Sequence, residues 1–198
     1  MKPFTIVFIG PQGSGKGTQI SKLDKVFNEK DPTRQTIDFQ TGRRFRALAM
    51  KGEGYTEKHI TNTLDSGILQ PLFLSVVLWG DAMREHMNPE RHALIDGFPR
   101  TVPEAVVLES AWEFYDRKNV IIINLDTPED VVRVRMHERA RKDDTSASIE
   151  ARLKWYKEET LPVLEYYRKR AGTEVIDIDG TSSIDDVHAQ ICTALKLL

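Results

Sequence analysis

The chain has almost no cysteine and no excess of basic residues. Cys192 is the single cysteine among 198 residues, which excludes an internal disulfide and a thiolate zinc site, so we expect no structural zinc. The formal net charge of −2 argues against a nonspecific nucleic-acid binder, which needs a basic excess. No apolar run approaches membrane-spanning length and no signal-peptide core precedes the first apolar run, so we expect a cytoplasmic protein with no membrane partner.

Short apolar runs alternate with helical patterns along the chain. The apolar runs typical of strands cover residues 4–9, 35–39, 92–95, 120–125 and 174–178. The helical patterns cover residues 14–27, 43–51, 56–65, 71–87, 103–117, 129–139, 146–169 and 184–197. This alternation predicts an α/β fold in which one parallel sheet is covered by helices on both faces. The length of 198 residues favours a single domain, 1–198.

The stretch from residue 42 to residue 87 carries only helical patterns. It is too long to be one crossover helix, so we interpret it as a helical insertion into the α/β core. Insertions at the ends of strands are where substrates are commonly gripped. We therefore expect residues 42–87 to bind a substrate.

A glycine-rich turn follows the first apolar run and is the most informative motif. It reads Gly-Pro-Gln-Gly-Ser-Gly-Lys-Gly-Thr over residues 10–18 and leads into a helical pattern. The order of strand, glycine-rich turn and helix is typical of a phosphate-binding loop, in which backbone N–H groups and the helix dipole face one anion. Lys16 adds a charge that reaches the terminal phosphates. The alternative is a plain strand-to-helix turn with Lys16 in solvent.

A second motif, Asp-Gly-Phe-Pro-Arg, ends the apolar run of residues 92–95. A carboxylate such as Asp96 at the end of a strand can hold Mg²⁺ beside bound phosphates. Arg100 follows at the same edge of the sheet, where a guanidinium group can bind a phosphate through two hydrogen bonds. Without the phosphate loop, a strand-ending turn would explain this motif equally well.

A third motif is a series of arginines, Arg133, Arg135, Arg139, Arg141 and Arg152, interrupted by two aspartates at positions 143 and 144. Several guanidinium groups near a bend between two helices suit a phosphoryl group in transfer, whose charge spreads over three oxygens. The alternative is a solvated basic helix end with the two aspartates as local partners.

Over nearly its whole length the chain resembles the adenylate kinase family of nucleoside monophosphate kinases. The matching motifs are GKGT at residues 15–18, TGRRFR at residues 41–46, DGFPR at residues 96–100, RKDD at residues 141–144, Arg152-Leu153 and IDG at residues 178–180. The resemblance implies a P-loop NTPase-type three-layer fold. Its five-stranded parallel sheet carries the helical acceptor-binding insertion, about 42–87, and a short lid, about 139–144.

The resemblance also implies the roles of individual residues. ATP would be bound by Gly13, Ser14, Gly15, Lys16, Gly17, Thr18, Arg135 and Ser182. The nucleoside monophosphate would be bound by Thr41, Arg46, Gly97, Arg100 and Glu104. The catalytic set would be Lys16, Asp96, Arg100, Arg139, Arg141 and Arg152. Asp96 would hold Mg²⁺ through water.

Three positions depart from the family pattern. Only Ala140 separates Arg139 from Arg141, so the lid is minimal. Arg43 stands where the family has an aspartate near the metal. Glu104 stands where adenylate kinases commonly have a glutamine that reads the adenine. A carboxylate only accepts hydrogen bonds, so Glu104 would repel adenine N1 and suit guanine.

Glu104 also has a purely structural interpretation. The segment from Thr101 to Glu104 has the spacing of a capping box, in which the carboxylate reaches back to the Thr101 N–H. Both interpretations stay open at this point. The sequence therefore does not decide whether the base of the acceptor is adenine or guanine.

We conclude from the sequence that the chain is a phosphotransferase whose acceptor is a phosphate group. The expected reaction is Mg²⁺-dependent transfer of the γ-phosphoryl group of ATP to AMP, by a cytoplasmic and monomeric enzyme. The alternatives are the same fold with another acceptor, such as GMP, and a nucleotide-binding module without turnover.

Overall fold

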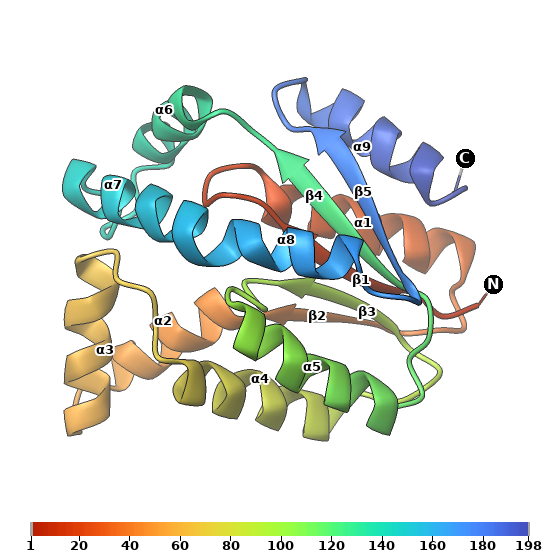
Figure 1. The fold of residues 1–198 in the computed structure, drawn as a ribbon, viewed down its shortest axis with the longest axis horizontal. Coiled ribbons are helices and arrows are strands. Elements are labelled where there is room, and N and C mark those ends of the chain that lie inside the picture. The colour runs from red at the N-terminus through yellow and green to blue at the C-terminus, as the bar shows by residue number, and fades with distance from the viewer. Residues whose placement is uncertain (1, 198) are drawn as a thin grey trace.

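The computed structural model describes residues 2–197, and its centre is one five-stranded parallel sheet (Figure 1). The strands are β1 (Thr5–Ile9), β2 (Thr36–Gln40), β3 (His92–Asp96), β4 (Val120–Asp126) and β5 (Thr173–Asp179). Their spatial order is β2-β3-β1-β4-β5, and every neighbouring pair is parallel. The predicted α/β fold with a five-stranded parallel sheet is confirmed.

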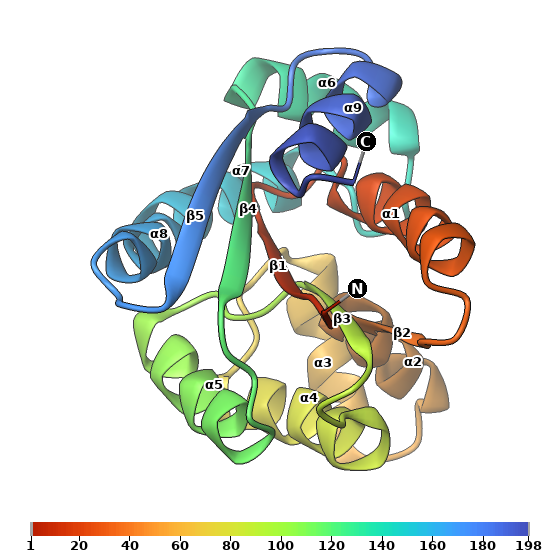
Figure 2. The same ribbon diagram turned by 90° about the vertical axis from the view of Figure 1, so that its right-hand side faces the viewer.

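Helices cover both faces of the sheet (Figure 2). One face carries α1 (Lys16–Lys30) and α9 (Ile184–Ala194), and the other carries α4 (Leu72–His86), α5 (Val102–Phe114) and α8 (Leu161–Arg168). The alternating side chains of β1 explain the two cores. Ile6 and Phe8 pack on the α1 side, while Val7 and Ile9 pack on the α4 side.

The remaining helices surround the carboxyl edge of the sheet. They are α2 (Thr41–Lys51), α3 (Tyr55–Asp65), α6 (Glu129–Arg139) and α7 (Ser146–Trp155). The run α2, α3 and α4 lies between β2 and β3 in the chain, where the sequence predicts a helical insertion. Its substrate-binding role stays a prediction at this point. Within residues 2–197, no helix combines the length and the apolar character that crossing a membrane requires.

The predicted single helix over residues 146–169 is wrong in detail. The structure divides it into α7, a π-helical turn η1 (Tyr156–Thr160) and α8. Pro162 in the first turn of α8 has no N–H, so it cannot donate to the carbonyl of Glu158 four residues earlier. The chain instead makes a wider turn, in which the Leu161 N–H donates to the Tyr156 carbonyl.

Other predicted boundaries shift by one to three residues. The first helix begins at Lys16 rather than at residue 14, and the fifth ends at Phe114 rather than at residue 117. Asp116 explains the second difference, because its φ of 50° lies in the left-handed region that ends a helix.

Candidate functional site

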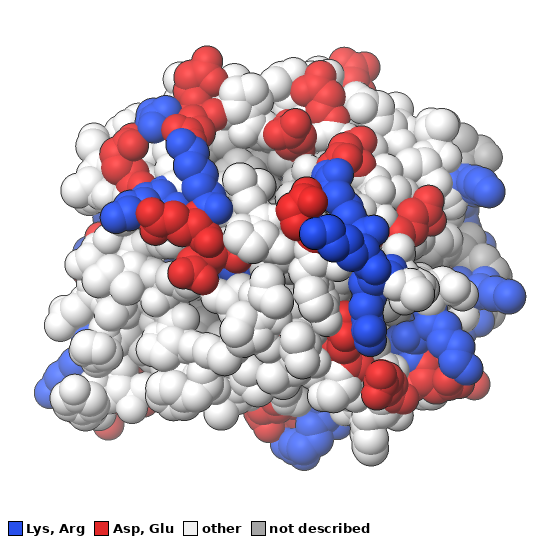
Figure 3. All heavy atoms as spheres, viewed as in Figure 1, with Lys and Arg blue, Asp and Glu red and all other residues white. Residues whose placement is uncertain are grey.

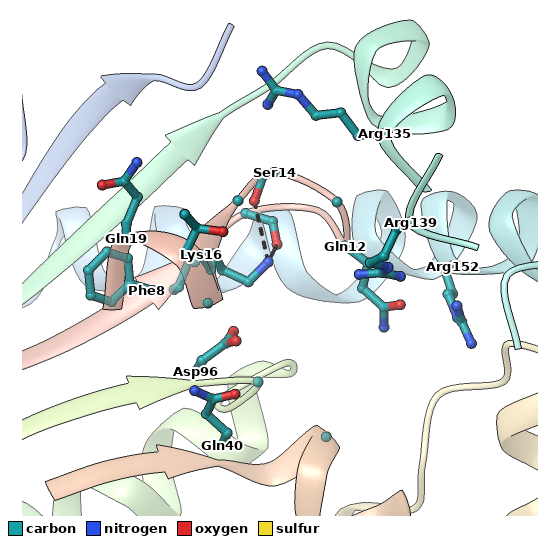
Figure 4. Close-up of a pocket in the computed structure, with 18 of the residues that line it drawn as sticks. Phe8, Gln12, Ser14, Lys16, Gln19, Gln40, Asp96, Arg135, Arg139 and Arg152 are labelled. Carbon is teal, nitrogen blue, oxygen red and sulfur yellow. Dashed lines mark hydrogen bonds between the residues drawn. The ribbon is translucent and has the colours of Figure 1, made fainter. Parts of the chain in front are cut away.

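A large cleft opens at the carboxyl edge of the sheet, with a volume of about 1070 Å³. Its walls come from the glycine-rich loop, α2, the loop after β3, α6, α7 and the turn after β5. Figure 4 shows Lys16 with Asp96 below it, and Arg139 and Arg152 farther along the cleft to the right. In parallel α/β sheets, ligands bind at this edge.

The glycine-rich loop closes tightly against β4 and α6. Gly10 has a φ of 150°, and a Cβ there would lie 2.8 Å from the Leu125 carbonyl oxygen. Gly13 has a φ of 92°, and a Cβ there would lie 2.8 Å from Met136 Cγ. These two positions therefore require glycine. The loop has the geometry of a backbone cradle that faces the cleft.

Lys16 bends back across this loop. Its Nζ donates to the carbonyl oxygens of Gly10 and Pro11, both at 2.8 Å, and lies 3.4 Å from Ser14 Oγ. Burial lowers the pKa of Lys16 to about 8; nearby Asp96 opposes this shift, and Arg100 and Arg139 add to it. A bound polyphosphate would place negative charge beside Lys16 and so stabilise its protonated form.

Asp96 ends β3 between two neighbouring strands. In the sheet register it stands opposite Phe8 of β1 and Gln40 of β2. Within residues 2–197 no group of three or more His, Cys, Asp and Glu side chains is arranged to hold a metal ion. One carboxylate beside a phosphate loop still suits Mg²⁺, because this ion takes most of its ligands from phosphates and water. The residues present therefore fit a metal ion that arrives with a nucleotide.

Arg43 lines the cleft and forms an ion pair with a carboxylate of β2. Its Nη1 lies 3.8 Å from Asp38 Oδ2, and its side chain is 65% exposed. Burial raises the pKa of Asp38, against the effects of Gln40 and Arg43. The cation that replaces the family aspartate is thus an exposed surface partner of β2.

The loop after β3 brings Thr41, Gly97 and Arg100 together. The Gly97 carbonyl accepts from Thr41 Oγ1 at 2.9 Å and from Arg100 Nε at 2.8 Å. A Cβ on Gly97, whose φ is 87°, would lie 2.5 Å from Thr41 Oγ1. Gly97 and Arg100 line the cleft, whereas Thr41 is 1% exposed and stands behind its wall.

Glu104 is 2% exposed and lies behind the backbone of Arg100. Its Oε1 accepts from Ser75 Oγ at 2.5 Å and from Trp79 Nε1 at 3.0 Å, and its Oε2 accepts from the Arg100 N–H at 2.7 Å. Thr101 Oγ1 caps α5 by accepting from the Glu104 N–H at 3.3 Å. The capping box is therefore only half formed, because the carboxylate serves the Arg100 N–H rather than that of Thr101.

The two aspartates of the RKDD motif hold two of the arginines. Asp144 accepts from Arg139 through Nε at 2.9 Å and Nη2 at 2.8 Å, and from Arg152 Nη1 at 2.8 Å. Asp143 accepts from Arg152 Nη2 at 2.5 Å. Burial alone would raise the pKa of Asp144, but Arg139 and Arg152 outweigh it and lower that pKa.

Arg141 and Arg46 lie at the border of the cleft. Burial lowers the pKa of both, and Arg139 lowers each further. For Arg46, the carboxylate of Asp143 opposes the shift. Arg141 sits in the exposed turn between α6 and α7, so of the lid arginines it is the one most open to solvent.

The side chain of Arg135 reaches from α6 to the turn after β5. Its Nη1 donates to the Gly180 carbonyl at 2.7 Å (Figure 4 shows it apart from the other arginines). Ser182 follows in the same turn, 3.5 Å from Asp179 Oδ2 through its hydroxyl. Arg135 and Ser182 both line the cleft, at the end where the sequence places the ATP adenine.

The sequence did not single out several residues that line the cleft. They are Gln40, Phe45, Gln70, Trp155 and Thr160. Trp155 could have been found, because it is three residues after Arg152 on the same helical pattern and therefore shares its face. Thr160 could not, because its position depends on the π-helical turn.

A phosphate loop at the carboxyl edge of a five-stranded parallel sheet, beside several arginines, defines the class of P-loop nucleotide-binding proteins. The family follows from comparison with known proteins. A protein-family model described as Adenylate kinase matches residues 8–172. The chain belongs to the adenylate kinase family, whose members are phosphotransferases.

Relatives match along almost the whole chain. An adenylate kinase of Corynebacterium urealyticum is 35% identical over 96% of this chain and 99% of its own length. An adenylate kinase of Corynebacterium diphtheriae is 34% identical over 96% of this chain and 98% of its own, and adenylate kinase 1 of a Nostoc species is 32% identical over 96% and 97%.

Proposed function

We propose that this protein transfers the γ-phosphoryl group of ATP to AMP and forms two molecules of ADP. The observation that carries this proposal is the cleft itself, where a phosphate loop, Asp96 and Arg100 meet the arginines of α6 and α7. Two nucleotides bound at the opposite walls of such a cleft would bring their phosphates together between these cations. The names of the relatives support adenylate as the acceptor.

The donor side would hold the ATP phosphates. The backbone N–H groups of residues 13–18 would bind phosphate oxygens, and Lys16 would leave the Gly10 and Pro11 carbonyls to pair with the terminal phosphates. Arg135 and Ser182 would border the adenine. Asp96 would hold Mg²⁺ through water, and this ion would neutralise charge on the donor phosphates.

The acceptor side would hold the monophosphate. Arg46 and Arg100 would bind its phosphate group, and Gly97 would border its base. Arg139, Arg141 and Arg152 would face the group in transfer and stabilise its spreading negative charge. Positioning and exclusion of water supply the catalysis, with no covalent enzyme intermediate. We propose the α2–α4 insertion as the acceptor-binding part and the turn at residues 139–144 as the lid.

GMP is the alternative acceptor that Glu104 suggested, and the contacts of Glu104 do not favour it. Both carboxylate oxygens already accept hydrogen bonds from the protein. Residence in the cytoplasm and a monomeric state remain predictions from the sequence.

A coupled assay of ADP formation with AMP, GMP, CMP and UMP tests this function. We expect AMP to give a kcat/KM at least tenfold above the other three, with no turnover when Mg²⁺ is chelated. A preference for GMP would identify GMP, rather than AMP, as the acceptor. No turnover with any of the four, by a protein that binds ATP, would identify a nucleotide-binding module.

A further inference from the structure

Two side chains from the ends of the π-helical turn meet at one residue, Arg100. The Trp155 ring lies against the guanidinium group, with 5.2 Å from Arg100 Cζ to the ring centroid. Thr160 Oγ1 donates to the Arg100 carbonyl at 2.9 Å. Both contacts join segments that are more than fifty residues apart in the sequence.

The wide turn is what brings these two side chains to one face. In an α-helix, residues five apart differ by about 140° around the axis, so Trp155 and Thr160 would point in different directions. In a π-helical turn the hydrogen bonds run from i to i+5, so residues five apart lie nearly above one another. The segment Tyr156–Thr160 has this geometry. The turn therefore allows one helix to contact both ends of Arg100.

Trp155 also contacts the acceptor-side insertion. Its Nε1 donates to the Gly67 carbonyl at 2.9 Å, just after α3. Gly67 packs so closely on α7 that a Cβ there would lie 2.4 Å from the Ser148 carbonyl oxygen. Arg152 makes a second contact between α7 and the insertion, because its Nη2 donates to the Leu64 carbonyl at 3.1 Å. One indole thus touches both the insertion and Arg100.

These contacts leave one edge of the Arg100 guanidinium group available. Nε is bound to the Gly97 carbonyl at 2.8 Å, and the ring of Trp155 covers one face. Among residues 2–197, neither Nη of Arg100 has a hydrogen bond of its own, and the side chain lines the cleft. The two Nη groups are therefore the ones that a phosphate can reach.

We propose that Trp155 is a positioning residue for the acceptor: it fixes the plane of the Arg100 guanidinium group and ties that plane to the Gly67 backbone of the insertion. Thr160 supports the same arrangement from the backbone side of Arg100. This inference rests on the proposed role of Arg100 in binding the acceptor phosphate. Closing of the insertion and orientation of Arg100 are then coupled through one side chain.

The test compares Trp155→Leu, Trp155→Phe and the neighbouring control Lys154→Ala, which changes an exposed residue of α7. We expect Trp155→Leu to raise the KM for AMP about tenfold, because it removes the cation–π contact and one hydrogen bond. The KM for ATP should stay within twofold and kcat within about threefold, since Arg100 faces the acceptor. Trp155→Phe should recover part of the loss because it keeps an aromatic face, and Lys154→Ala should match the parent protein.

Binding of AMP measured by calorimetry separates this inference from the function on which it rests. In an Arg100→Ala background, Trp155→Leu should change the AMP Kd by less than twofold. A further tenfold loss there would mean that Trp155 acts without Arg100 and would overturn the inference. If Arg100→Ala alone leaves AMP binding and turnover unchanged, the proposed role of Arg100 is wrong, whatever Trp155 does.

A second variant, Thr160→Val, tests the inference if Trp155→Leu folds poorly. Thr160 is buried, and valine has nearly its shape without the hydroxyl. We expect a rise of about threefold in the KM for AMP and an unchanged KM for ATP. Equal changes for both nucleotides, or none, would contradict a positioning role for this turn.

Discussion

The two walls of the cleft are built in different ways. On the proposed donor wall, the phosphate loop is one continuous stretch of chain, in which Lys16 donates to the Gly10 and Pro11 carbonyls only a few residues away. The acceptor wall is assembled from distant segments, because Arg100 receives contacts from Trp155 and Thr160 as well as from its own loop. Local hydrogen bonds of Lys16 thus hold the phosphate loop, whereas tertiary contacts hold Arg100 on the proposed acceptor wall.

This difference predicts how each wall responds to change. The phosphate loop keeps its shape as long as its own residues and the two elements it packs against, β4 and α6, stay in place. An assembled wall depends on helices that are far apart in the chain, so substitutions outside the cleft can disturb it. The acceptor side should therefore be the more sensitive to substitutions at a distance.

Charge is also distributed differently over the molecule and in the cleft. Figure 3 shows acidic and basic side chains interspersed on the face seen in Figure 1. Inside the cleft cations outnumber carboxylates, and Asp144 pairs with two of the arginines. One carboxylate thus fixes the relative position of Arg139 and Arg152.

The largest expected effect comes from removing one charge from each wall. Lys16→Ala and Arg100→Ala should each lower kcat/KM on the order of a hundredfold or more, because each cation faces transferring charge in a water-poor site. Steady-state kinetics with both nucleotides varied measures this. Near-normal turnover in either folded variant would remove the proposed mechanism.

Asp144→Ala should give the largest loss of stability. It leaves Arg139 and Arg152 without their shared carboxylate, and breaking a buried pair in this way costs about 3–5 kcal/mol of unfolding free energy. Asp143→Ala is the matched control, since the Asp143 carboxylate forms an ion pair with one arginine, Arg152, rather than with two, and is more exposed. Urea unfolding of both variants measures the difference, and equal losses would contradict the central position of Asp144.

The same carboxylate should make stability depend on pH. The folded-state pKa of Asp144 is lowered, so the unfolded chain binds its proton at a higher pH than the folded protein does. The contribution of Asp144 to the free energy of unfolding is therefore present above the usual aspartate pKa of about 4 and is lost as the pH falls below that value. Asp144→Asn should flatten this part of the pH profile.

Glu104→Gln should have a smaller effect, on stability rather than on specificity. A glutamine amide would direct an NH₂ group at one of the donors that Glu104 now accepts from, at a cost of about 1–3 kcal/mol. A fall in Tm of roughly 2–4 °C per kcal/mol follows for a domain of this size. The ratio of kcat/KM for AMP to that for GMP should stay unchanged. A shift of tenfold or more in this ratio would instead make Glu104 a reader of the base.

The smallest expected effect is proton uptake by Lys16. Because its pKa is about 8 without ligand, part of the Lys16 population is neutral at pH 8.5. A bound triphosphate favours the charged form, so ATP binding should take up a fraction of a proton there and almost none at pH 7. Calorimetry in two buffers of different ionisation enthalpy measures the uptake. Lys16→Met should abolish it, and equal uptake in that variant would assign the proton to another group.

Local patterns were enough to predict the sheet and the glycine-rich loop at its edge. The alternation of strands and helices predicted the parallel sheet, because apolar periodicity is set by nearest neighbours in each element. Gly10 and the Gly15-Lys16 pair, between a strand and a helix, predicted the phosphate loop. The structure adds that Gly10 and Gly13 combine a positive φ with close approach to β4 and α6, which only glycine allows. Asp96 and Arg100 were predicted from their place at the end of a strand, and both line the cleft, while their roles stay predictions.

Contacts between distant segments were decided by the tertiary structure alone. The sequence left Glu104 between two roles, and its carboxylate instead bonds to Ser75, Trp79 and the Arg100 N–H. The π-helical turn was read as plain helix, because periodicity cannot register one extra residue per turn at Pro162. Trp155 contacts Arg100 only because segments far apart in the chain pack together. The pattern of neighbouring residues in the sequence does not predict such a contact.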